Sequence, residues 1–311
     1  MKAIMIETYG GKEQLKERQM DLPVISDNQV LLEVYATSVN PIDWKVREGY
    51  LKEMLPFEFP IILGWDAAGI IAEVGENVSN FKAGDRVFAR PATTNQGTYA
   101  EFVPVDQELL AKMPENMSFE EAAAIPLAGL TAWQCLVDFA EIKKGDKILI
   151  HAGAGGVGNF AIQLAKYFGA YVATTASKEN EEFVKSLGAN QVIDYKEEVF
   201  NEILEDYDIV LDAIGGDVLE KSYQVLKKGG KLVSIAGQPS DEDAEKFGVK
   251  AGFLWLEPKG EQLQKLADLF VAGELKPVIG ETFELTEQGL KKAHELSETH
   301  HARGKIVIKV K

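Results

Sequence analysis

A glycine-rich turn between a predicted strand and a predicted helix constrains this chain more than any other feature. The turn runs from Gly153 to Gly158 with the sequence GAGGVG, one residue after the apolar run Lys147–His151. Residues 159–168, behind the turn, carry apolar side chains at helical spacing. Gly153 permits a tight turn, Gly155 lets a phosphate approach the backbone, and Gly158 lets the helix pack against its strand. Backbone N–H groups and a positive helix end then face a pyrophosphate, so the turn predicts a dinucleotide-binding βαβ unit.

Strands and helices alternate through the middle of the chain. A capping-box pattern, Ser118 to Glu121, begins this region. Helices are predicted at 157–168, 179–187 and 217–226. The predicted strands are 147–151, 171–175, 191–194, 208–212, 231–236 and a last one within 249–256. This alternation implies right-handed crossovers, an α/β fold and a doubly wound parallel (Rossmann) sheet.

The two ends of the chain have a different pattern of predicted secondary structure. Residues 1 to about 115 read as short strands cut by turns, which predicts a compact β-barrel or sandwich. The tail holds predicted helices at 260–272 and 286–297 and a closing strand at 305–310. That strand has no sheet of its own, so we expect it to return to the N-terminal β domain. The predicted domains are 1–117, 118–258 and 259–311.

Composition and charge exclude several classes of function. The 311 residues carry a formal net charge of −16, which argues against broad binding to nucleic acid or to anionic membranes. No apolar stretch reaches transmembrane length, and we expect no secretory signal because the first apolar run is short and soon followed by charge. Cys135 is the only cysteine, so no internal disulfide forms and a reducing compartment fits. We expect a cytoplasmic protein.

The second predicted strand indicates which dinucleotide binds. An acidic residue about 20 positions after the glycines holds the ribose 2′-hydroxyl of NAD in such folds. Here the strand ends in Thr174-Thr-Ala-Ser177-Lys178, with no carboxylate at its tip. A hydroxyl and an ammonium attract a 2′-phosphate, so NADPH is the predicted cofactor, with Ser177 and Lys178 on its phosphate. The alternative is that Ser177 is an N-cap and Lys178 a solvated side chain.

Several longer motifs resemble one family. The run Gly64 to Val87 is similar to the barrel signature of the medium-chain dehydrogenases/reductases, and within that family to the zinc-free quinone oxidoreductases. Residues 128–133, 188–195 and 304–308 match the same branch. The resemblance implies a GroES-like N-terminal domain, a Rossmann domain and a C-terminal segment that rejoins the first domain. It also implies an active cleft between the two domains.

The chain departs from the zinc-dependent members of that family. Those members have an early barrel cysteine and Gly-His-Glu where this chain has Gly64-Trp65-Asp66. One cysteine cannot supply a four-cysteine structural lobe, and a catalytic zinc needs three protein ligands. His151 and His294 fit structural roles, and His300 with His301 reads as a solvated helix end. No bound metal is therefore expected.

The resemblance also supplies candidate catalytic residues, namely Asn40, Asp43 and Tyr50. Asn40 would hydrogen-bond the nicotinamide or the acceptor oxygen, and Tyr50 would stack on or donate to a planar acceptor. The alternatives are an Asn-Pro turn for Asn40 and Asp43, and barrel-edge packing for Tyr50. The full set of predicted cofactor residues, partly from the turn and partly from strand-end positions, is Thr131, Gly153, Ala154, Gly155, Gly156, Val157, Gly158, Ser177, Lys178, Tyr195, Ile214, Gly237, Phe253, Leu254 and Arg303.

Without a Lewis acid, hydride donation to a polarised acceptor is easier than oxidation of an unactivated alcohol. We therefore expect an NADPH-dependent reductase of quinones or α,β-unsaturated carbonyls. An alkenal or enoyl-thioester reductase and a non-catalytic NADPH-binding protein stay open as alternatives. A homodimer is expected through the edge strand near 249–255, which is apolar enough to favour a partner.

Overall fold

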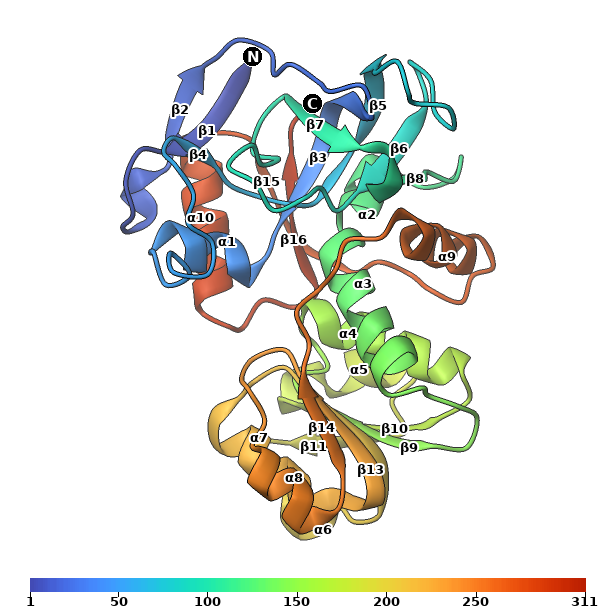
Figure 1. Ribbon diagram of the computed structural model, residues 1–311. Coiled ribbons are helices and arrows are strands. Elements are labelled where there is room, and N and C mark those ends of the chain that lie inside the picture. Colours follow the sequence, from blue (N-terminus) through green and yellow to red (C-terminus); the bar gives the residue numbers. More distant parts are fainter. The chain divides into compact units, whose positions relative to one another are not determined.

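The computed structural model describes residues 1–311, which form two compact units (Figure 1). The first unit contains residues 1–127, 258–271 and 277–311. The second contains residues 128–257 and 272–276. No helix in the structure combines the length and the apolar character needed to cross a bilayer.

The second unit is built on a six-stranded sheet with the order β11-β10-β9-β12-β13-β14. Every neighbouring pair in it is parallel. The strands are β9 (Lys147–Ile150), β10 (Tyr171–Ala176), β11 (Gln191–Asp194), β12 (Tyr207–Asp212), β13 (Leu226–Ser234) and β14 (Lys250–Phe253). Numbered within the unit, this order is 3-2-1-4-5-6, the arrangement typical of dinucleotide-binding sheets. The predicted doubly wound parallel sheet is confirmed.

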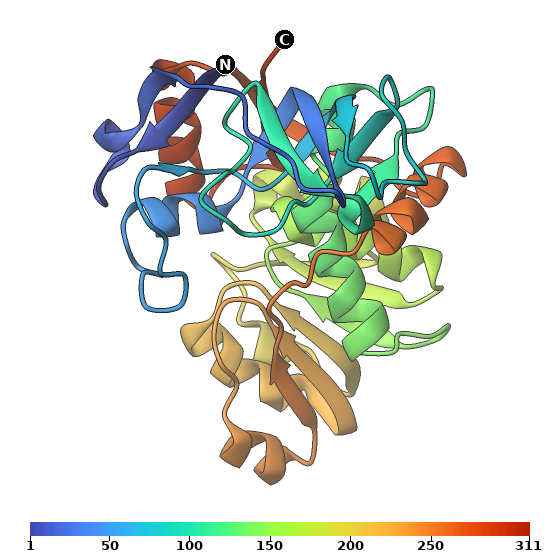
Figure 2. The same ribbon diagram turned by 45° about the horizontal axis from the view of Figure 1, so that its top comes forward.

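Helices cover both faces of this sheet (Figures 1 and 2). Those that connect its first strands and those that connect its last strands fall on opposite faces, as right-handed crossovers require. The helices are α3 (Pro126–Trp133, entering from the first unit), a π-helical turn (Gln134–Phe139), α4 (Gly156–Tyr167), α5 (Glu181–Leu187), α6 (Phe200–Ile203), α7 (Gly216–Ser222) and α8 (Asp241–Phe247). Short 3₁₀ turns lie at Lys178–Asn180 and Tyr223–Val225.

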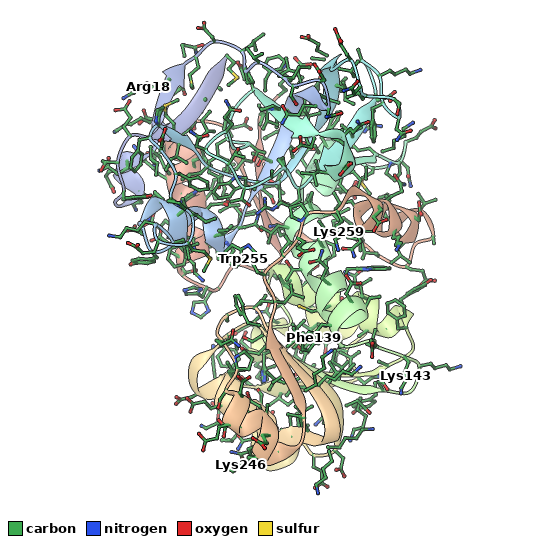
Figure 3. The ribbon with its side chains drawn as sticks, viewed as in Figure 1. Arg18, Phe139, Lys143, Lys246, Trp255 and Lys259 are labelled. Carbon is green, nitrogen blue, oxygen red and sulfur yellow. The ribbon has the colours of Figure 1, made fainter.

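Because all strands of the sheet are parallel, their amino ends lie along one edge and their carboxyl ends along the opposite edge. All six strands end at one edge, and the segments after them are where ligands bind in open α/β sheets. Trp255 follows β14 at this carboxyl edge, whereas Lys246 and Lys143 precede β14 and β9 (Figure 3). β14 is a lateral edge strand with partly exposed residues, and dimerisation through it stays a prediction.

The first unit is mainly β-structure. A three-stranded sheet has the order β2-β1-β4, and a seven-stranded sheet has the path β15-β16-β3-β5-β6-β8 with β7 paired to β3. The strands are β1 (Lys2–Ile6), β2 (Lys16–Gln19), β3 (Gln29–Val39), β4 (Ile61–Ile62), β5 (Ala67–Val74), β6 (Arg86–Ala89), β7 (Phe102–Asp106), β8 (Leu110–Lys112), β15 (Ile279–Glu284) and β16 (Lys305–Lys309). As predicted, the closing strand joins the N-terminal β-structure, because β16 pairs with β3.

Four helices belong wholly to this unit. They are α1 (Pro41–Arg47), α2 (Phe119–Ala123), α9 (Gly260–Val271) and α10 (Glu287–Glu298), with 3₁₀ turns at Lys12–Gln14 and Gln107–Leu109. The capping box predicted at Ser118 is confirmed, since the Glu121 N–H donates to Ser118 Oγ at 3.1 Å. The sequence reading missed α1 and β15. One apolar core joins β1, Trp65, Tyr99 and the buried side of α10.

Candidate functional site

The glycine turn joins β9 to α4 at the carboxyl edge of the parallel sheet. A Cβ on Gly153 would lie 2.0 Å from Thr174 Oγ1, and one on Gly158 would lie 2.3 Å from the Ala152 carbonyl oxygen. Both positions therefore require glycine for close packing. At Gly155 a Cβ would meet only the Ala152 carbonyl oxygen, at 3.3 Å, which is a tight contact but a milder one than at the other two glycines. The first turn of α4 adds N–H groups that lack partners within the helix, and the arrangement fits a pyrophosphate.

A chain of buried hydrogen bonds supports the residue before this turn. Ser222 Oγ donates to the Val218 carbonyl at 2.6 Å, so its only proton is used and it accepts from His151 Nε2 at 3.0 Å. Burial lowers the pKa of His151 to about 4, which keeps the ring neutral. Nδ1 then accepts from Thr175 Oγ1 at 3.2 Å, and Thr175 Oγ1 accepts the Ala152 N–H at 3.1 Å. Ala152 has φ +54°, so this chain holds a left-handed residue in place.

The buried imidazole predicts a pH-dependent contribution to stability. The pKa of His151 is lower in the folded protein than its usual 6.5, so the unfolded chain binds the proton more tightly. The free energy of unfolding therefore falls as the pH drops below about 6.5, and it continues to fall down to about pH 4. The shift corresponds to about 3 kcal/mol at pH 4. Asp43, with its pKa raised to about 7 by burial, changes stability in the opposite direction. We therefore expect the wild type to lose about 3 kcal/mol more than His151→Asn between pH 7 and pH 4, as measured by urea unfolding. Equal losses would contradict this.

The structure places most of the predicted cofactor residues at one edge. Ser177 and Lys178 follow β10, Tyr195 follows β11, and Ile214 follows β12. Gly237, Phe253 and Leu254 stand at or beyond the ends of β13 and β14. Thr131 lies in α3 and is buried, and Arg303 belongs to the first unit. Their roles in cofactor binding stay predictions.

A carboxylate that the sequence reading did not weigh lies beside Ser177. The pKa of Glu179 is lowered, chiefly by a hydrogen bond from Ser177 and also by Lys196, whose Nζ is 3.6 Å away. Ser177 is buried and its Oγ accepts from Asn180 Nδ2 at 3.2 Å, whereas Lys178 is exposed. Lys178 is therefore the freer of the two candidates for a 2′-phosphate.

Two further residues shape the carboxyl edge. Asp212, the last residue of β12, accepts the N–H groups of Ile214 and Gly215 at 3.0 Å each and the Ser234 hydroxyl at 2.6 Å. Ser234 Oγ in turn accepts the N–H of Gly237 at 3.1 Å. The turns that carry Ile214 and Gly237 are thus both fixed by hydrogen bonds to the buried pair Asp212 and Ser234. The signal for this pair was a polar residue at the end of each of two apolar strands.

In the first unit, Asn40 belongs to a buried group that we call the Asp66 cluster (Ser38, Asn40, Asp66 and Lys305). Asp66 Oδ2 accepts from Ser38 Oγ at 2.6 Å and from Asn40 Nδ2 at 2.7 Å, and Oδ1 accepts the Leu127 N–H at 2.7 Å. Lys305 Nζ donates to Asn40 Oδ1 and lies 3.5 Å from Asp66 Oδ2. Burial lowers the pKa of Lys305, while the two nearby carboxylates oppose that effect.

Asp43 is held by a second buried chain. Its Oδ2 accepts the Asn40 N–H at 2.8 Å, at the start of α1, and the Tyr99 hydroxyl at 2.7 Å. His294 Nε2 lies 3.1 Å from that hydroxyl, and Arg47 Nη1 donates to His294 Nδ1 at 3.1 Å. Because arginine only donates, His294 is neutral with its proton on Nε2, and burial lowers its pKa to about 3. These contacts give Asp43 a role in helix capping, and Asp43 Oδ1 has no partner.

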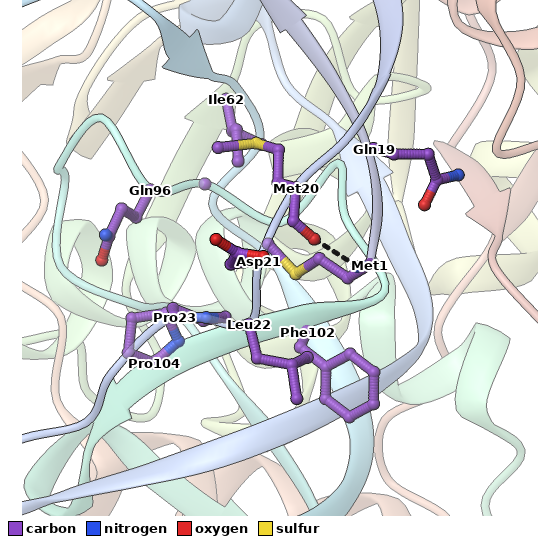
Figure 4. A pocket seen from close by; sticks show the side chains of 11 residues that line it. Met1, Gln19, Met20, Asp21, Leu22, Pro23, Ile62, Gln96, Phe102 and Pro104 are labelled. Carbon is purple, nitrogen blue, oxygen red and sulfur yellow. Dashed lines mark hydrogen bonds between the residues drawn. The ribbon is translucent and has the colours of Figure 1, made fainter.

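Tyr50, unlike Asn40 and Asp43, is not buried. Its side chain is 70% exposed and meets Trp44 edge-on, with ring centroids 6.1 Å apart. A separate pocket of about 570 Å³ in the first unit includes none of the predicted site residues (Figure 4). Its walls come from β2, the segment after it and the strand region near Phe102. No group of three or more His, Cys, Asp or Glu side chains is arranged to hold a metal ion.

Comparisons with known proteins agree with this architecture. Residues 26–115 match the alcohol dehydrogenase GroES-like domain, and residues 187–308 match the zinc-binding dehydrogenase family. The chloroplastic NADPH-dependent alkenal/one oxidoreductase of Arabidopsis thaliana is 38% identical over 99% of this chain and 79% of its own length.

Solved structures of quinone oxidoreductases match over the whole chain. The enzyme from Coxiella burnetii is 41% identical with a TM-score of 0.93, covering 100% of this chain and 99% of its own. The Escherichia coli enzyme, solved with NADPH, is 29% identical with a TM-score of 0.89 and full coverage of both chains. This chain therefore belongs to the medium-chain dehydrogenase/reductase family, in its quinone oxidoreductase branch.

Proposed function

We propose that the protein is an NADPH-dependent reductase of quinones or α,β-unsaturated carbonyls. The observation that carries this proposal is the glycine turn at the carboxyl edge of the parallel sheet, where Gly153 and Gly158 exclude side chains and the backbone N–H groups at the start of α4 are available to a phosphate. The similar Escherichia coli quinone oxidoreductase was solved with NADPH, and the Arabidopsis relative is named for alkenals and alkenones.

The preference for NADPH rests on the residues after β10. Lys178 is exposed there and offers a cation to a 2′-phosphate. Glu179 accepts a hydrogen bond from Ser177 and forms an ion pair with Lys196, so its negative charge is partly compensated within the protein. We infer that Lys178 supplies most of the discrimination between the two nicotinamide coenzymes.

The chemistry requires little from the protein beyond orientation and hydrogen bonding. NADPH, when bound, supplies a hydride. A conjugated carbonyl accepts it without a Lewis acid because the incoming charge moves onto oxygen. Asn40 is the proposed donor to that oxygen, and Tyr50, which is exposed, is the proposed stacking partner of a planar acceptor. Positioning of this kind lowers the activation barrier of hydride transfer, because the entropy of bringing the reactants together is lost on binding and not in the reaction step.

Turnover separates the proposed reductase from a protein that only binds NADPH. NADPH oxidation, followed at 340 nm, is expected with a panel of simple quinones or with alkenals and alkenones, and not with saturated aldehydes. Asn40→Ala should lower kcat/KM by about 100-fold while the Kd for NADPH stays within about twofold. Tight NADPH binding without turnover of either class would contradict the proposal. Turnover of the enones alone would identify the protein as an alkenal reductase.

A further inference from the structure

The side-chain amide of Asn40 lies between two buried charges of opposite sign. Its Oδ1 accepts from the ammonium of Lys305, which also donates to the Val39 carbonyl at 3.2 Å. Its Nδ2 donates to Asp66 Oδ2 at 2.7 Å. The three side chains are almost inaccessible to solvent, with exposed fractions of 2% for Asn40, 3% for Lys305 and 0% for Asp66.

This arrangement permits one orientation of the amide. An ammonium has only donors and an ionised carboxylate only acceptors. Rotating the amide by half a turn would place its oxygen against Asp66 and its NH₂ against Lys305, which replaces two charge-assisted hydrogen bonds with two repulsions. In a buried environment such contacts are costly. Asp66 is itself fixed, because the Ser38 hydroxyl donates to its Oδ2 and the Leu127 N–H donates to its Oδ1.

One hydrogen of the Asn40 amide is left without a protein partner. Nδ2 carries two N–H donors, and only the one to Asp66 is used. We propose that Lys305 and Asp66 are positioning residues, which hold the second N–H of Asn40 as a fixed donor for the oxygen of the acceptor. The proposal rests on the reductase function proposed above.

A fixed donor has a definite use in that reaction. When a hydride and its electron pair form the new C–H bond at the β-carbon of an enone, the π electrons move to the carbonyl oxygen. The acceptor is reduced, NADPH becomes NADP⁺, and the negative oxygen or the α-carbon takes a proton from water. A donor that is already oriented stabilises this charge without reorganising as it develops. The same logic applies to the two oxygens of a quinone.

A double-mutant cycle tests whether Asp66 acts through Asn40. Asp66→Asn keeps the shape and removes the charge that fixes the amide, and it is expected to lower kcat/KM by about tenfold. In an Asn40→Ala background the same change should alter kcat/KM by less than about twofold, because there is no amide left to orient. An equal loss in both backgrounds would overturn the proposal. Lys309→Met, on the same strand as Lys305 but with a side chain 45% exposed, serves as the control and should leave kcat/KM unchanged.

A second readout does not depend on turnover. In protein labelled with [¹⁵N]asparagine, the Asn40 side-chain amide is assigned by its absence from the Asn40→Ala spectrum. Its bonded N–H should exchange with solvent at least about tenfold faster in Asp66→Asn than in the wild type, because one charged partner is gone. An unchanged exchange rate would overturn the proposal that Asp66 holds the Asn40 amide in place. Failure of the wild type to reduce any acceptor, with the exchange difference present, would instead refute the proposed function.

Discussion

Valine in place of Gly158 is expected to abolish coenzyme binding, raising the Kd for NADPH by more than about 100-fold. A Cβ there would lie 2.3 Å from the Ala152 carbonyl oxygen and 2.7 Å from Gly153 Cα. Both are backbone atoms, so the whole turn must move away from α4. Ala152 already has φ +54° and has little freedom to adapt. Isothermal titration calorimetry with NADPH measures the loss.

Gly155→Ala distinguishes two causes of weaker NADPH binding, namely loss of the folded structure and obstruction of the phosphate site. Its Cβ would meet only the Ala152 carbonyl oxygen, at 3.3 Å, a tight contact that needs a much smaller shift than the 2.3 Å contact at Gly158. The thermal unfolding midpoint should therefore fall by much less than in Gly158→Val, while the added methyl stands where a phosphate approaches and raises the Kd about tenfold. Gly11→Ala in the first unit, where the nearest atom is the Glu13 carboxylate at 3.3 Å, should change neither quantity. A folded Gly158→Val protein with wild-type affinity would show that NADPH binds elsewhere.

Reversing the charge at Lys178 is expected to shift coenzyme preference by about 100-fold from NADPH toward NADH. The change removes the cation proposed to meet the 2′-phosphate and sets a second carboxylate beside Glu179. NADH, which has a hydroxyl at that position, suffers no such repulsion and gains an acceptor for it. The ratio of kcat/KM for NADPH to that for NADH, in wild type and Lys178→Glu, measures the shift.

Two further variants make the coenzyme test specific. Lys185→Glu reverses a charge on α5 that is also exposed and is paired with Glu181 at 2.6 Å, so it controls for the general effect of charge. It should move the ratio by less than about twofold. Glu179→Gln removes the neighbouring carboxylate and should strengthen the preference for NADPH. The assignment fails if the wild type uses both coenzymes equally, or if Lys178→Glu leaves the ratio unchanged.

The second unit was predictable from sequence because its information is local. Each strand is a short apolar run, α4, α5 and α7 lie where helices were predicted, and the glycine turn stands between one strand and one helix. The short helices α6 and α8 were missed. The closing strand was also placed correctly, since residues 305–310 had no partner nearby. By contrast, α1 has only seven residues and begins at Pro41, which reads equally well as a turn. β15 holds Gly280 and three acidic or hydroxyl side chains in its exposed stretch, and pairing with β16 determines its conformation.

The buried polar groups of the first unit could not be predicted in this way. Lys305 and Asn40 are 265 residues apart, Arg47 and His294 are 247 apart, and no local pattern joins them. Lys305 looks like an ordinary lysine at the start of a strand, and His294 like one residue of an amphipathic helix. Only the insertion of β16 beside β3 and the packing of α10 against α1 bring these side chains together.

The return of β16 has a consequence for biosynthesis. The second unit is nearly contiguous, so it can fold while the ribosome is still translating the tail. The first unit, whose largest segment is translated first, is completed only with residues 305–309, because only then can β3 gain β16 as a partner beside β5 and β7, and Asp66 gain the ammonium of Lys305. Until that moment a nascent chain leaves one side of β3 unpaired and Asp66 without the ammonium of Lys305. A premature stop before Lys305 therefore yields a polypeptide that lacks both the last strand of the seven-stranded sheet and the cation that faces Asp66.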